Sequence, residues 1–163
     1  MSRDAISKNF ANIALFDGLS LEQLTEISGI AERAFFQQGA TLAACGEPSD
    51  KAILVVDGEL ECTGGVSLAT PLAGNQAGRM IAEMAMFIED FKHSSTFVAR
   101  TPTKALVIQR AAMLAKLEAD RQLAALFIKN IASRLNGTLT ELKAVENSLR
   151  PEQPANIAEG RAA

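Results

Sequence analysis

The chain has 163 residues, of which 48% are apolar and 21% are charged, with a formal net charge of −3. This composition excludes a disordered chain and is typical of one folded domain with a sizeable core. The acidic balance argues against a nucleic-acid-binding surface, and no apolar run approaches the ~18 residues that cross a bilayer. Since the N-terminus MSRDAISKNF lacks the apolar stretch of a secretory signal, we expect a cytoplasmic protein with free thiols.

The residue types that carry catalysis and metal binding are sparse. The chain has one histidine, two cysteines, no tryptophan and no tyrosine. The cysteines are far from the histidine in the sequence, which excludes the usual zinc spacings. No local pattern indicates a serine, cysteine or histidine nucleophile either. We therefore expect no enzyme, no catalytic residue and no metal site.

Two helices are expected at the N-terminus. Ile6, Phe10 and Ile13 recur at spacings of four and three, which predicts a short amphipathic helix within residues 4–16. Ser20, followed by Gln23, resembles a capping box. It predicts a second helix that runs to about residue 32.

From residue 34 the pattern changes to short β-type runs that end in glycine: AFFQQG, TLAACG, KAILVVDG and ELECTG. Such closely spaced turns suggest an antiparallel barrel or roll. Asp57-Gly58 predicts a β-hairpin, because a type I′ turn needs the positive φ that glycine adopts. Polar and apolar residues alternate from Glu59 onward, so Cys62 is expected to be a small core residue rather than a redox group.

Residues 78–99, GRMIAEMAMFIEDFKHSSTFVA, are expected to form a strand, a short helix, a loop and a strand. We call this segment the cassette. The first N–H groups of its helix, over residues 82–87, lack partners within the helix and could face an anion. Glu83 is then either an acceptor for ribose hydroxyls or a carboxylate that the helix dipole stabilises. The apolar strand KALVIQR and a helix over residues 111–118 follow, and Asp120 can cap the next helix.

The last predicted helix is the longest and covers about residues 121–149 without a proline. One stripe of residues recurs along it at spacings of three and four, as in a coiled-coil seam. The stripe consists of Ile128, Ile131, Leu135, Thr138, Leu142 and Val145. It predicts a homodimer, although the helix could instead lie on its own roll. Residues 150–163 are rich in proline and alanine and should form a disordered tail.

This order of elements resembles the cyclic nucleotide-binding domain over about residues 15–149. The likeness rests on the phrase FFQQGATLAACGEPSDKAILVVDGELE and on the cassette. It implies an α+β fold, in which an antiparallel β-roll or jelly roll carries N-terminal helices, a short cassette helix and a long C-terminal helix. The domain would fill residues 1–149, and cyclic AMP or cyclic GMP would be its ligand, with no other cofactor.

In this family the cassette typically reads Phe-Gly-Glu-Leu-Ala-Leu, followed after a loop by arginine and a small residue. Here the same places hold IAEMAM, from Ile81 to Met86, and then His93-Ser94. The Cβ of Ala82 could crowd the sugar where the family has glycine. His93 stands where arginine would pair with the phosphate, and an ordinary histidine is mostly neutral at pH 7. The resemblance implies ligand contacts by Ala82, Glu83, Ala85, His93, Ser94 and Thr138.

Other residues could change this reading of the site. Lys92 would point to the opposite face, and Arg79 would reach inward only if the loop departs from the family pattern. Thr138 lies where the catabolite activator branch places a threonine that contacts the purine across the dimer, or it is a tolerated polar residue of the seam.

That branch also continues into a helix-turn-helix domain, whereas this chain stops, so we expect no direct nucleic-acid binding. The expected function is a dimeric regulatory sensor with a degenerate cassette, weak or altered ligand binding and an effector protein as partner. The alternative is a non-binding module for dimerisation and partner docking.

Overall fold

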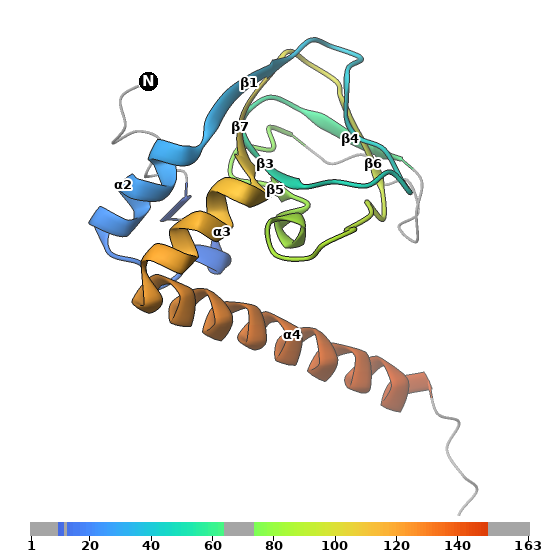
Figure 1. Cartoon of the computed structure of the whole chain (residues 1–163). Helices are drawn as coiled ribbons and strands as arrows, with labels where there is room; N and C mark the ends of the chain where they lie inside the picture. Colours follow the sequence, from blue (N-terminus) through green and yellow to red (C-terminus); the bar gives the residue numbers. More distant parts are fainter. Residues whose placement is uncertain (1–9, 12, 64–73, 150–163) are drawn as a thin grey trace, which may run out of the picture. The chain divides into compact units, whose positions relative to one another are not determined.

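The computed structural model of the protein describes residues 10–11, 13–63 and 74–149. Within these ranges, two antiparallel sheets form the body of the fold (Figure 1). One sheet has the strand order β1-β7-β3-β5, and the other has the order β2-β6-β4. The strands are β1 (Glu32–Phe36), β2 (Thr41–Ala43), β3 (Lys51–Asp57), β4 (Leu60–Thr63), β5 (Met80–Ile81), β6 (Thr96–Ala99) and β7 (Thr103–Gln109). The expected antiparallel roll is confirmed.

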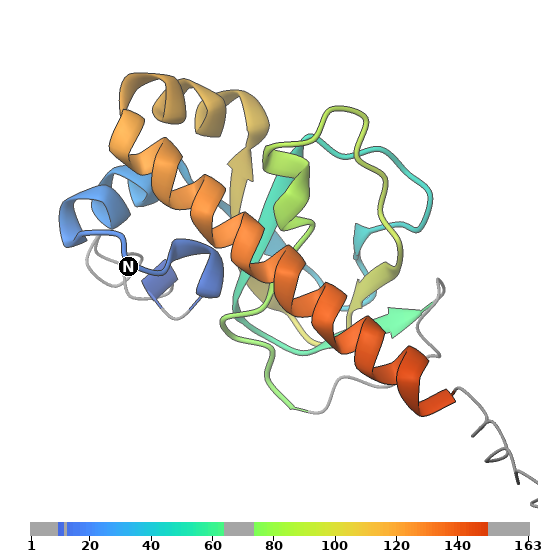
Figure 2. The ribbon, with the colours of Figure 1, turned by 90° about the horizontal axis from the view of Figure 1, so that it is seen from below.

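Helices precede the roll, interrupt it and follow it, as expected. They are η1 (Ala14–Phe16), α2 (Leu21–Ile30), η2 (Glu83–Met86), α3 (Arg110–Ala119) and α4 (Arg121–Leu149). α2 and α3 lie beside each other (Figures 1 and 2). The expected long C-terminal helix is confirmed as α4.

Both predicted helix caps are present. The Ser20 hydroxyl accepts a hydrogen bond from the Gln23 N–H (3.2 Å), and the Gln23 side chain accepts one from the Ser20 N–H (3.0 Å). At α4, the Asp120 carboxylate accepts hydrogen bonds from the N–H groups of Gln122 (2.8 Å) and Leu123 (3.0 Å). These local signals therefore fixed where α2 and α4 begin.

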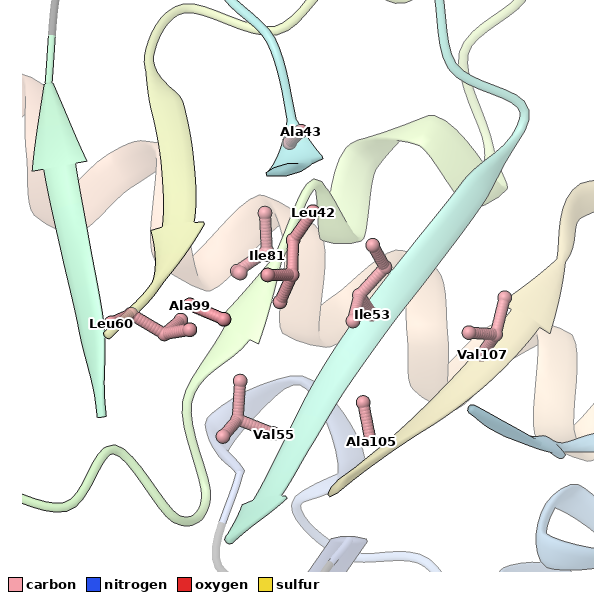
Figure 3. Close-up of a cluster of buried hydrophobic side chains, with 9 residues drawn as sticks. All are labelled: Leu42, Ala43, Ile53, Val55, Leu60, Ile81, Ala99, Ala105 and Val107. Carbon is pink, nitrogen blue, oxygen red and sulfur yellow. The ribbon is translucent and has the colours of Figure 1, made fainter. Parts of the chain in front are cut away.

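A cluster of buried apolar side chains fills the space between the two sheets (Figure 3). Its members are Leu42, Ala43, Ile53, Val55, Leu60, Ile81, Ala99, Ala105 and Val107. We call the face of each sheet that carries this cluster the inner face. Side chains alternate along a strand, so Leu54, Leu106 and Ile108, which are also buried, belong to the other face of their sheet. Burial on both faces explains the nearly continuous apolar runs of β3 and β7.

Aromatic side chains connect the N-terminal segment, the cassette and α4. The Phe16 ring contacts Phe10 (5.0 Å between centroids) and Phe127 (5.4 Å), both edge-to-face. Phe87, which directly follows η2, contacts Phe127 at 5.7 Å. Phe10, Phe16 and Phe127 are almost completely buried. The first turns of α4 are thus part of the same core as the cassette.

The prediction of a β-hairpin at Asp57-Gly58 is wrong. β3 pairs with β7 on one side and with β5 on the other, so neither edge of β3 is left for β4. β4 pairs instead with β6 in the second sheet. Gly58 does have a positive φ of +124°, but the turn carries the chain from one sheet to the other. The exposed Cys45 and the half-buried Cys62 are free thiols.

The described residues fall into two compact units, one ending at Asn130 and the other beginning at Ile131. In the first unit, the Asn130 amide donates hydrogen bonds to the carbonyls of Leu15 (3.0 Å) and Asp17 (2.8 Å). The expected start of the first helix near Ile6 and the expected tail at 150–163 lie outside the described residues. No helix of the described chain combines the length and apolarity that a membrane span requires.

Candidate functional site

The cassette crosses from one sheet to the other. β5 is an edge strand of the four-stranded sheet, whereas β6 is the central strand of the three-stranded sheet. Between them, η2 packs against β3 and α3. The predicted order of strand, short helix, loop and strand is therefore present, and the cassette connects the two sheets.

Ala82 adopts the left-handed conformation, with φ 56° and ψ 37°, at the residue before η2. This conformation costs a residue with a Cβ about 1–2 kcal/mol, and glycine adopts it freely. Ala82 is half-buried and packs against the cluster on the inner face. The backbone thus keeps a glycine-like geometry although the residue is alanine.

The predicted contact residues on η2 differ in their exposure. Glu83 is half-buried at the first position of the helix. Ala85 is fully buried, and its N–H donates to the Ala82 carbonyl (2.9 Å). Because η2 is a 3-10 helix of four residues, it offers fewer unpaired N–H groups than the expected α-helix. Any contact by Ala85 would need its backbone rather than its side chain.

His93 and the exposed Ser94 lie in the loop that follows η2. The His93 N–H donates to the Glu47 carbonyl (3.0 Å), and its own carbonyl accepts from the Gly46 N–H (2.8 Å). Partial burial lowers the pKa of His93; the Glu47 carboxylate opposes this shift, whereas the Lys51 ammonium adds to it. The imidazole is therefore neutral at pH 7 and contributes no positive charge to the site.

Arg79 reaches the inner face, which the sequence allowed only for a loop that departs from the family pattern. The Gly78 N–H donates to the Val55 carbonyl (2.9 Å), while the Val55 N–H donates to the Arg79 carbonyl (2.9 Å). Two residues thus oppose one, with the first a glycine at φ +86°, which is the pattern of a G1 β-bulge. Arg79 is consequently paired with Val55, an inner-face residue. Its guanidinium lies 5.8 Å from the centroid of the Phe97 ring, which packs against the inner cluster.

The predicted seam residues belong to α4 and differ in exposure. Most are more than half exposed: Ile128 (68%), Leu135 (57%), Leu142 (60%) and Val145 (54%). Ile131 is half-buried, and Leu139, outside the predicted stripe, is 53% exposed. Thr138 is exposed, and its hydroxyl donates to the Arg134 carbonyl (3.1 Å). Thr138 belongs to the second compact unit, whereas the other predicted contact residues belong to the first.

Two facing antiparallel sheets, bridged by a strand–helix–loop–strand cassette and followed by a long helix, define a β-roll domain with an inserted cassette. Residues 33–120, which include the whole cassette, match the family model of the cyclic nucleotide-binding domain. The chain therefore belongs to the cyclic nucleotide-binding domain family. Among the described residues, no three His, Cys, Asp or Glu side chains are grouped as a metal site would require.

Solved structures share this fold. The N-terminal domain of a transcriptional regulator from Streptomyces coelicolor A3(2) matches with a TM-score of 0.72 and 22% identity, over 85% of this chain and 94% of that one. The Thermus thermophilus catabolite activator protein matches with a TM-score of 0.67 and 23% identity, over 84% of this chain and 63% of that one. A cyclic nucleotide-binding domain from Methylobacillus flagellatus KT matches with a TM-score of 0.66 and 23% identity, over 92% and 85% of the chains. No curated protein matches the sequence.

Proposed function

We propose that the protein is a dimeric cyclic-nucleotide sensor domain of the cytoplasm, which binds a ligand rather than catalysing a reaction. The contact between Phe87 and Phe127 carries this proposal. Phe87 directly follows η2 within the cassette, and Phe127 lies in the second turn of α4. A ligand that moves the cassette must therefore displace or repack the first turns of α4. A ligand can shift such an equilibrium only by as much as it prefers one state.

The proposed ligand is cyclic AMP or cyclic GMP, held at the cassette. The proposed contact residues are Ala82, Glu83, Ala85, His93 and Ser94, with Thr138 contributing in the dimer. Replacing a charged hydrogen bond to the phosphate by a neutral histidine removes about 1.5–3 kcal/mol, and each ~1.4 kcal/mol is tenfold in affinity. The strained Ala82 adds the Cβ that the family's glycine lacks. We propose that binding is weakened or altered for these reasons.

The exposed apolar stripe of α4 supports a homodimer. Leu135 and Leu142 are one heptad apart, and each is more than half exposed in the single chain. A helix that buries this stripe against a second copy would remove several large apolar side chains from water. The domain from Streptomyces coelicolor belongs to a transcriptional regulator, which supports a regulatory role and an effector protein as partner.

Calorimetric titration of the full chain with cyclic AMP and cyclic GMP tests ligand binding. The titrations are run at about pH 6 and pH 8, on either side of the usual histidine pKa. We expect saturable binding of at least one nucleotide. If neither nucleotide binds at either pH, the sensor proposal fails.

Hydrogen exchange tests the coupling between the cassette and α4. Adding a saturating nucleotide should change the exchange of amides in residues 121–130 of the wild type. Phe87→Ala should remove this change, because it deletes the ring that contacts Phe127. Ile88→Ala is the matched control, since Ile88 is adjacent and 46% exposed. If the nucleotide changes the exchange of residues 121–130 in the Phe87 variant as much as in the wild type, the proposed coupling through Phe87 and Phe127 is refuted.

Sedimentation tests the dimer. Leu142→Gln should shift the protein from dimer to monomer, whereas Lys143→Gln, one residue away and outside the stripe, should leave the dimer intact. A wild type that stays monomeric at high concentration would refute the dimer.

A second candidate is a non-binding module that uses the same fold for dimerisation and partner docking. The strained Ala82 and the neutral His93 favour it, because both depart from the residues that the family uses for the ligand. A dimer that binds neither nucleotide would support this module over the sensor.

A further inference from the structure

Gly78 determines the direction of the Arg79 side chain. In a G1 bulge the second residue of the bulged strand pairs with the single opposing residue, so their side chains share one face. Val55, the opposing residue, is fully buried in the inner cluster. Ile81, two residues after Arg79, belongs to the same cluster, as the alternation of a strand requires. Two independent relations thus place Arg79 on the inner face.

Two contacts hold the Arg79 guanidinium in place and leave N–H donors for a ligand. It lies over the Phe97 ring at 5.8 Å, and Nη1 donates to the Gln76 side-chain oxygen (3.2 Å). Arginine has five N–H donors, and this bond to Gln76 uses one. The residue remains exposed, and Phe97 and Ala82 pack against the same cluster. A fixed, accessible guanidinium therefore stands on the inner face, on the strand that enters the cassette.

We propose that Arg79 supplies the positive charge that binds the phosphate of the ligand, in place of His93. This inference rests on the proposed function, because it concerns the same ligand site. A guanidinium binds phosphate through two parallel charged hydrogen bonds and keeps its charge at all physiological pH values. The contact with Phe97 restricts the side chain before binding, which lowers the entropy lost when the phosphate binds.

The test is calorimetric titration of the full-length wild type and variants with cyclic AMP and cyclic GMP at about pH 8, where His93 is neutral. Arg79→Gln should raise the dissociation constant of the nucleotide by about 10- to 100-fold. Arg79→Lys keeps the charge and should lose less. The control Arg121→Gln, at the exposed start of α4, should stay within about twofold of the wild type.

The variants separate charge from packing. If Arg79 only covered Phe97, Gln and Lys would weaken binding equally, and that result overturns the inference. Thermal melts check folding. Should the Gln variant fail to fold, the Lys variant decides: a partial loss of affinity that keeps the salt dependence of the wild type supports the charge, whereas a full loss of binding or no loss at all overturns the inference. Binding that Arg79→Gln leaves unchanged overturns the role of Arg79 alone. A wild type that binds neither nucleotide overturns the proposed function and this inference together.

Discussion

Replacing Gly58 by alanine should lower the free energy of unfolding by about 2–6 kcal/mol. The glycine has φ +124°, and a Cβ built there lies 2.5 Å from the Thr103 hydroxyl oxygen and 2.9 Å from the Thr103 Cα. Thr103 is fully buried, and its hydroxyl donates to the Thr101 carbonyl (2.9 Å), so it has little room to move. Backbone strain contributes ~1–3 kcal/mol and overpacking another ~1–3 kcal/mol.

Urea denaturation followed by circular dichroism measures this loss against two matched glycines. Gly46 has φ +81° and nothing within 4 Å of an added Cβ, so Gly46→Ala should show only the backbone cost, ~1–2 kcal/mol. Gly29 lies within α2, also in open space, so Gly29→Ala should stabilise the protein by ~0.5–1 kcal/mol. If Gly58→Ala loses no more than Gly46→Ala, the close approach to Thr103 does not restrict the fold as described.

Other predictions concern pH and α4. Because burial lowers the pKa of His93 below its usual 6.5, the unfolded chain binds this proton more readily. The free energy of unfolding should therefore decrease as the pH drops below about 6.5. Over the same pH range, the urea midpoint of His93→Gln should decrease less than that of the wild type. Asn130→Ala removes the donor to two carbonyls and should cost ~1–3 kcal/mol, whereas Asn136→Ala, exposed on the same helix, should cost less. Asp120→Ala should destabilise α4 more than Asp120→Asn, which keeps a capping oxygen.

Local signals in the sequence predicted the helices best. A capping box acts within four residues, so Ser20 and Gln23 could be paired without knowledge of the fold. Asp120 could be assigned as a cap for the same reason. The roll was predicted from its glycine-separated β-runs, since each short run has to end in a turn.

The pairing of strands was harder to predict. Asp57-Gly58 has the residues of a hairpin turn, but the partner of β3 is decided by β7, which lies far along the chain. A two-residue motif contains no information about which strand, β4 or β7, pairs with β3. The direction of Arg79 stayed open for a related reason, because the bulge at Gly78 exists only relative to Val55. Within the cassette, the sequence identified the departures at Ala82 and His93 but could not decide whether Arg79 points to the inner face.

The ring contacts around Phe16 have a consequence for synthesis of the chain on the ribosome. The Phe16 ring, which also contacts Phe10, packs against Phe127, and the Leu15 carbonyl accepts a hydrogen bond from Asn130, 115 residues later. At about 5–20 residues per second, synthesis of the intervening 115 residues takes ~6–23 s. During that interval its phenylalanines are exposed to chaperones and to other nascent chains. Packing of the first turns of α4 is therefore the step that covers the Phe16 ring.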